Sequence, residues 1–194
     1  MAGWESTMLS RAAYLVADSG SGGTSVGLHL ARFCLEDGGR VLWAAPEMPD
    51  PARFSQILGS LSLAASTRFH AMNLIGRMDL VTKALEGAAR DLPGVRLVVL
   101  DDWAPSTGRI PAADVSAVVA LLSALQEHAT VLLIAKPGTD MEAEDGVRVR
   151  SQPDLEAAGC TVWRLEKINQ GQIRLSSGGT EVQLSPTDDG FEGA

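Results

Sequence analysis

Residues 13–24, AYLVADSGSGGT, decide the fold that we expect for this chain. The first five residues of this stretch form a continuous apolar run, which is typical of a strand buried on both faces of a sheet. Small residues follow, and from Val26 onward apolar side chains recur at helical spacing until Gly38 and Gly39 end the segment. This order of strand, glycine-rich loop and helix predicts an α/β fold in which the loop joins a buried strand to a helix N-terminus.

Strands and helices alternate along the rest of the chain. Further strands are expected at 41–45, 68–75, 95–100 and 131–135, and helices at 54–61, 80–92 and 115–125. Because these strands are apolar, we expect a mostly parallel central sheet with helices on both faces. A C-terminal antiparallel hairpin is expected from 161–168 and 172–175, followed by a last strand at 181–184.

Length and composition indicate one domain, which we place at residues 1–186, with a disordered tail at 187–194. The 24 acidic and 16 basic residues give a formal charge of −8, so the overall field opposes a phosphate backbone and any nucleic-acid contact must be local or shared with a partner. No apolar run reaches the length of a membrane span and no signal peptide is indicated, so the cytoplasm or the nucleus is the expected location. Cys34 and Cys160 lie in apolar runs and are expected to be core thiols.

The glycine-rich loop departs from the phosphate-binding P-loop pattern G-x-x-x-x-G-K-[ST]. The aligned window begins at position 17 and continues with Asp18, Ser19, Gly20, Ser21, Gly22, Gly23 and Thr24. Ala17 replaces the first glycine, Gly23 replaces the lysine that neutralises phosphate oxygens, and Asp18 adds a carboxylate to the cradle. We therefore expect a structural turn with no nucleotide cofactor. Weak nucleotide binding or residual ATPase activity, completed by a neighbouring subunit, is the alternative.

Acidic residues stand where an ATPase would hold its metal and activate water. Asp101 and Asp102 end an apolar strand, which is the place of a Walker-B aspartate, and Glu47 follows the strand at 41–45. Without the lysine, a helix cap or a solvated surface is the simpler interpretation of these carboxylates. The three histidines show no metal-ligand spacing, and no serine or cysteine has a recognisable base partner. The sequence therefore predicts neither catalytic residues nor a metal site.

Four segments, taken in order, resemble one known family. They are LVAD at 15–18 with the lysine-less loop behind it, FSQILG at 54–59, VVLDD at 98–102 and GQIRLSSGG at 171–179. Over about residues 13–184 this order is similar to subunit six of the Elongator complex, a family with a RecA-like P-loop fold that has lost its ATPase motifs. The resemblance rests on the order of the segments and on the shared absence of the lysine.

The resemblance implies a non-catalytic subunit that works within an assembly. In that family the subunit alternates with two sister RecA-like subunits in a hexameric ring, which associates with the catalytic Elongator subunits and binds tRNA for modification of the wobble uridine. The alternative is a RecA-paralogue mediator of DNA recombination that binds single-stranded DNA and a recombinase. An ATPase with a non-standard loop is a third class, which Gly23 disfavours.

Arg148 and Arg150 are the candidate RNA-binding residues. They lie in an aperiodic stretch at 136–159, just after an acidic run at 142–145. In RecA-like rings the corresponding loops face the central pore, and arginine suits contact with phosphates and bases. A solvated loop whose arginines pair with its own acidic residues is the alternative of equal weight.

Overall fold

The computed structural model of the chain describes residues 3–10, 12–139 and 147–193. The strands are β1 (Ala13–Ala17), β2 (Arg40–Ala45), β3 (Phe69–Asn73), β4 (Val95–Asp101), β5 (Thr130–Ala135), β6 (Gly138–Thr139), β7 (Val147–Arg148), β8 (Thr161–Asn169), β9 (Gln172–Ser177), β10 (Thr180–Thr187) and β11 (Gly190–Gly193). The helices are α1 (Trp4–Met8), α2 (Gly23–Glu36), α3 (Pro51–Leu58), α4 (Leu63–Ser66), α5 (Met78–Asp91), α6 (Ala112–Leu125) and α7 (Gln152–Ala157).

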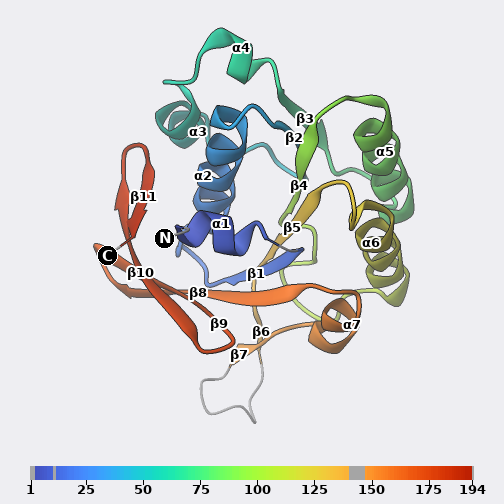
Figure 1. Ribbon diagram of the computed structural model, residues 1–194. Helices are drawn as coiled ribbons and strands as arrows, with labels where there is room; N and C mark the ends of the chain where they lie inside the picture. The colour runs from blue at the N-terminus through green and yellow to red at the C-terminus, as the bar shows by residue number, and fades with distance from the viewer. Residues whose placement is uncertain (1–2, 11, 140–146, 194) are drawn as a thin grey trace.

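Nine of the strands form one sheet in the order β11-β10-β9-β8-β1-β5-β4-β2-β3 (Figure 1). The strands from β8 across to β3 pair in parallel, whereas β8, β9, β10 and β11 pair antiparallel. The expected mostly parallel sheet and the expected C-terminal hairpin are therefore confirmed. In this order β1, β5 and β4 are neighbours, so the loops that follow these three strands meet at one edge of the sheet.

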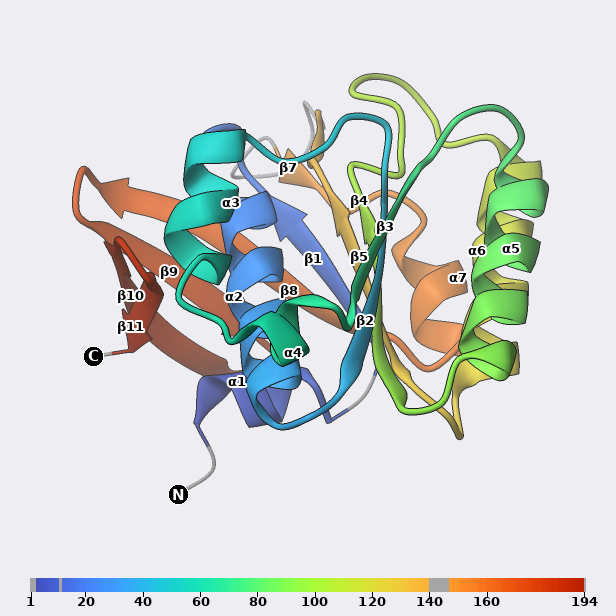
Figure 2. The same ribbon diagram turned by 90° about the horizontal axis from the view of Figure 1, so that it is seen from above.

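Helices cover both faces of the sheet, as the apolar strands predict. Helices α1 to α4 lie on one face and α5 to α7 on the other (Figure 2). The alternation along β1 shows the division, because Leu15 packs in the core beneath α2 whereas Tyr14 and Val16 pack in the core beneath α5 and α6. No helix in the described ranges is long and apolar enough to cross a membrane.

The expected disordered tail at 187–194 is wrong for the part that the structure describes. Thr187 ends β10, and residues 190–193 form β11, which pairs with β10 at the edge of the sheet. Phe191 is only 5% exposed and belongs to the core beneath α2. The sequence does not reveal this strand, because a single phenylalanine among acidic residues and glycines shows no period. Helices α1 and α4 were likewise not expected.

Phe191 should therefore contribute to the stability of the whole domain. We expect Phe191→Ala to lower the free energy of unfolding by about 3 kcal/mol, because it empties a buried aromatic site. The neighbouring exposed residue provides the control, and Glu192→Ala should change the value by less than about 0.5 kcal/mol. Urea unfolding of the two variants makes the comparison, and equal stabilities would show that β11 is only loosely attached.

Candidate functional site

The glycine loop, residues 18–22, connects β1 to α2 as the sequence predicts. Gly20 and Gly22 have φ values of 75° and 91°, a region that favours glycine. The Ser21 N–H and hydroxyl both donate to the carbonyl oxygen of Asp18, at 3.0 and 2.7 Å. The loop is therefore a tight turn that uses the Ser21 amide internally, and this amide is not free to bind a phosphate.

The position of the missing lysine has no room for a side chain. A Cβ atom on Gly23 would lie 2.6 Å from the Cβ of Ala17 and 3.2 Å from Cγ2 of Ile134. Ala17 is itself the residue that replaces the first glycine of the pattern. The two departures are thus one packing arrangement, in which the methyl group of Ala17 occupies the space beside position 23.

Thr24 and Asp101 are brought together at the ends of α2 and β4. The Thr24 hydroxyl donates to Oδ1 of Asp101 over 3.2 Å, and Asp101 is only 4% exposed. Burial raises the pKa of Asp101 to about 6, and the hydrogen bond from Thr24 opposes part of that rise. Asp101 is therefore not a solvated carboxylate, which was one of the two simpler interpretations of its place in the sequence.

Asp102 and Lys136 form a second pair at the same edge. Asp102 has a φ of 50°, which is unusual for a residue other than glycine, and this turns the chain directly after β4. The ammonium nitrogen of Lys136, the first residue after β5, lies 3.6 Å from Oδ2 of Asp102. Sequence reading overlooked Lys136, although its place directly after an apolar strand was a usable signal.

A cavity of about 540 Å³ opens between these pairs and α3. Its polar lining consists of Thr24, Ser25, Glu47, Asp50, Arg53, Asp101, Asp102 and Lys136. The guanidinium of Arg53 donates to Ser25 and to backbone carbonyls of the β10–β11 turn, and Lys136 pairs with Asp102. Arg53 and Lys136, the cations of this lining, therefore already bind other groups of the chain. The four carboxylates of the lining would repel a bound phosphate. Among the described residues, no group of His, Cys, Asp and Glu has the arrangement of a metal site.

The structure corrects the expectation for Arg150. Its side chain is only 6% exposed and donates to the carbonyl oxygens of Pro105, Gly108 and Lys136, at 2.6, 3.2 and 2.9 Å. The guanidinium therefore ties the loop after β4 to the end of β5 and has no free face for a phosphate. The side chain of Arg148 lies outside the described residues, as does the acidic run at 142–145.

The packing around Gly23 predicts the outcome of restoring the lysine. We expect Gly23→Lys to lower the free energy of unfolding by about 2 kcal/mol, because the new Cβ atom collides with Ala17. The double variant Ala17→Gly, Gly23→Lys should recover at least half of this loss. Urea unfolding of the two single variants and the double variant forms a double-mutant cycle. Additive effects in this cycle would show that positions 17 and 23 do not compete for the same space.

The raised pKa of Asp101 predicts a pH dependence of stability. Because the pKa is higher in the folded protein than the ordinary 3.8, this carboxyl stabilises the fold below about pH 4 and the contribution is lost as the pH rises through about 6. The free energy of unfolding relative to Asp101→Asn should thus fall by about 2 kcal/mol between pH 4 and pH 7. Asp91→Asn, on the surface of α5, is the control. A pH curve of Asp101→Asn parallel to that of the unchanged protein would contradict the assignment.

Comparison with known proteins gives a likeness in fold. No protein-family model matches the sequence, and no curated protein matches it. Among solved structures, this chain is similar to a DnaB-like replicative helicase that interacts with primase. The match covers 93% of this chain with a TM-score of 0.65 and a sequence identity of 13%. This chain spans 57% of the length of that helicase chain. At such an identity the likeness shows the fold alone, and the chain has a RecA-like fold.

Proposed function

We propose that the chain is a non-catalytic RecA-like subunit of the Elongator complex, where it joins a heterohexameric ring that binds tRNA for modification of the wobble uridine. The packing of Gly23 against Ala17 and Ile134 carries the non-catalytic part of this proposal, because it leaves no space for the phosphate-binding lysine. The order of the four sequence segments supports the family assignment.

The contacts beside the glycine loop support a degenerate site. In a working P-loop ATPase the hydroxyl and the Walker-B carboxylate serve the metal, and the lysine serves the phosphates. Here Thr24 is bonded to Asp101, and Lys136 is paired with Asp102. The groups that could serve a nucleotide are thus paired with one another, so a triphosphate would have to break these contacts and face the remaining carboxylates.

Exposed apolar side chains support a role in an assembly. Leu63, Ile75 and Leu80 are 82%, 72% and 59% exposed. They lie on α4, in the segment after β3 and on α5, and β3 is the edge strand of the sheet. Apolar residues near an open sheet edge favour contact with another chain. In the proposal this side of the domain, defined by Leu63, Ile75, Leu80 and β3, faces a sister subunit.

Affinity capture of the tagged chain from its own cells tests the proposal. We expect mass spectrometry of the captured material to show two further RecA-like chains, the catalytic Elongator subunits and tRNA. Ile75→Glu combined with Leu80→Glu should remove the sister chains, because a carboxylate cannot be buried there without a partner. Ser116→Glu combined with Ser123→Glu, which adds the same two charges at exposed positions of α6, is the matched control and should leave capture unchanged.

Two results would overturn the proposal. Capture of a recombinase and single-stranded DNA in place of the Elongator subunits would support a recombination mediator. ATP hydrolysis by the purified chain that disappears in Asp101→Ala would contradict the non-catalytic part.

A further inference from the structure

His29 joins the two ends of the chain on α2. Its Nδ1 atom lies 3.2 Å from the backbone nitrogen of Phe191 on β11, and its Nε2 atom lies 3.1 Å from Oε1 of Glu5 on α1. A backbone N–H can only donate, so Nδ1 must accept, and Nε2 must carry the proton that is donated to Glu5. These two contacts are satisfied together only by the neutral imidazole with its proton on Nε2.

The imidazole is closely enclosed by both termini. The ring of Trp4 stacks on it with centroids 5.0 Å apart, and the ring of Phe191 meets it edge-on at 6.2 Å. Gly190 lies so close that a Cβ atom there would collide with Nδ1, and its φ of 129° favours glycine. Trp4 also lies against Gly193, 3.3 Å from the position of a Cβ atom. The ring therefore has little room to move away from β11.

We propose that His29 is an acid-sensitive clasp, which holds β11 against α2 while the imidazole is neutral and lets the strand open more often when the imidazole takes up a second proton. Protonation places an N–H on Nδ1 opposite the N–H of Phe191, so a hydrogen bond becomes a contact between two donors. Histidine is the side chain suited to such a change near neutral pH. The inference is independent of the proposed function.

The charged neighbours of His29 determine whether its contact with α1 or its contact with β11 breaks on protonation. Glu5 forms an ion pair with the protonated ring, and Trp4 offers its face to the positive charge, so the contacts with α1 strengthen. Arg32, one turn along α2, is neutralised by Glu36 and Asp189. The contact with Phe191 is therefore the one that breaks, and β11 leaves while α1 stays.

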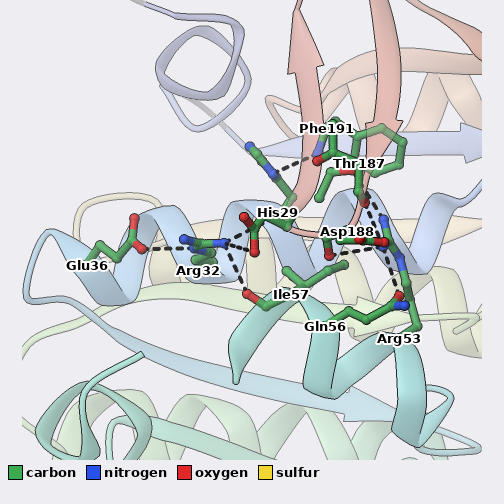
Figure 3. Close-up of polar contacts among 11 residues, drawn as sticks. His29, Arg32, Glu36, Arg53, Gln56, Ile57, Thr187, Asp188 and Phe191 are labelled. Atoms are coloured by element: carbon green, nitrogen blue, oxygen red, sulfur yellow. Dashed lines mark hydrogen bonds and ion pairs between the residues drawn. The ribbon is translucent and has the colours of Figure 1, made fainter. Parts of the chain in front are cut away.

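Two arginines confine the opening to β11. Figure 3 shows Arg53 reaching from α3 to the turn that precedes this strand. It donates to the carbonyl oxygens of Thr187 and Asp188 at 2.8 and 3.3 Å, and Arg32 donates to that of Asp189 at 3.3 Å. Neither arginine loses its charge on acidification, so the turn stays in place. Arg53 also donates to the carbonyl oxygen of Gly190 at 3.2 Å, so only residues 191–193 are then free to detach.

Release of β11 would change two surfaces. Phe191 lies 3.4 Å from the position of a Cβ atom on Gly22, so its departure uncovers the side of the glycine loop. The partner residues of β11, which run from Leu184 to Thr187 on β10, become an open sheet edge. Acidification thereby opens a pairing edge and the glycine loop together.

Hydrogen exchange of the intact chain, followed by NMR and corrected for the intrinsic effect of pH, tests the clasp. Between pH 8 and pH 5.5 we expect the Phe191 amide to lose about tenfold in protection, the factor that corresponds to one lost hydrogen bond. The amides of β9, two strands away in the sheet, should keep their protection and serve as the internal reference.

The matched variant is His29→Asn, whose side-chain oxygen can accept from Phe191 but cannot be protonated in this range. It should abolish the pH dependence and leave the protection at pH 8 nearly unchanged. Unchanged protection of Phe191 in the natural sequence, or an equal loss in His29→Asn, would overturn the proposal.

Discussion

The close approach of α2 to the sheet is the constraint on which the rest of the structure depends. Two glycines one turn apart, Gly23 and Gly27, face Ile134 of β5, and a Cβ atom on Gly27 would lie 2.7 Å from its Cδ1 atom and 2.9 Å from Cη2 of Trp43. The helix can lie this near only because neither position carries a side chain. The close packing of α2 therefore requires that position 23 carry no side chain. A lysine there would push away the first turn of α2, which holds Thr24 against Asp101.

Features that depend on neighbouring residues could be predicted from the sequence. Continuous apolar runs predicted the parallel strands, and the order of strand, small residues and helix predicted the glycine loop between β1 and α2. The sequence could not show which partners distant polar side chains would find. Arg150 looked like a surface cation because its neighbours are polar, yet its three acceptors come from the loop after β4 and the end of β5. Such contacts exist only once the strands are arranged in the sheet.

Arg53 and Arg150 make the same kind of contact at two places in the fold, because each donates hydrogen bonds to backbone carbonyl oxygens. Each guanidinium donates to three backbone carbonyl oxygens, those of Arg53 at the β10–β11 turn and those of Arg150 in the loop after β4 and at the end of β5. Arginine suits this task because its planar fork presents five donors in fixed directions. The donors used in this way are not available to a phosphate.

Asp101 and His29 respond to acid in opposite directions, and this separates a local change from global unfolding. Uptake of a proton by Asp101 removes a buried charge, so acid stabilises the body of the domain where α2 meets β4. Uptake of a proton by His29 opposes the contact with Phe191, so acid loosens the C-terminal strand alone. Because the strand lies at the edge of the sheet and its turn is held by Arg53, β11 can open at a pH where the sheet beneath it becomes more stable.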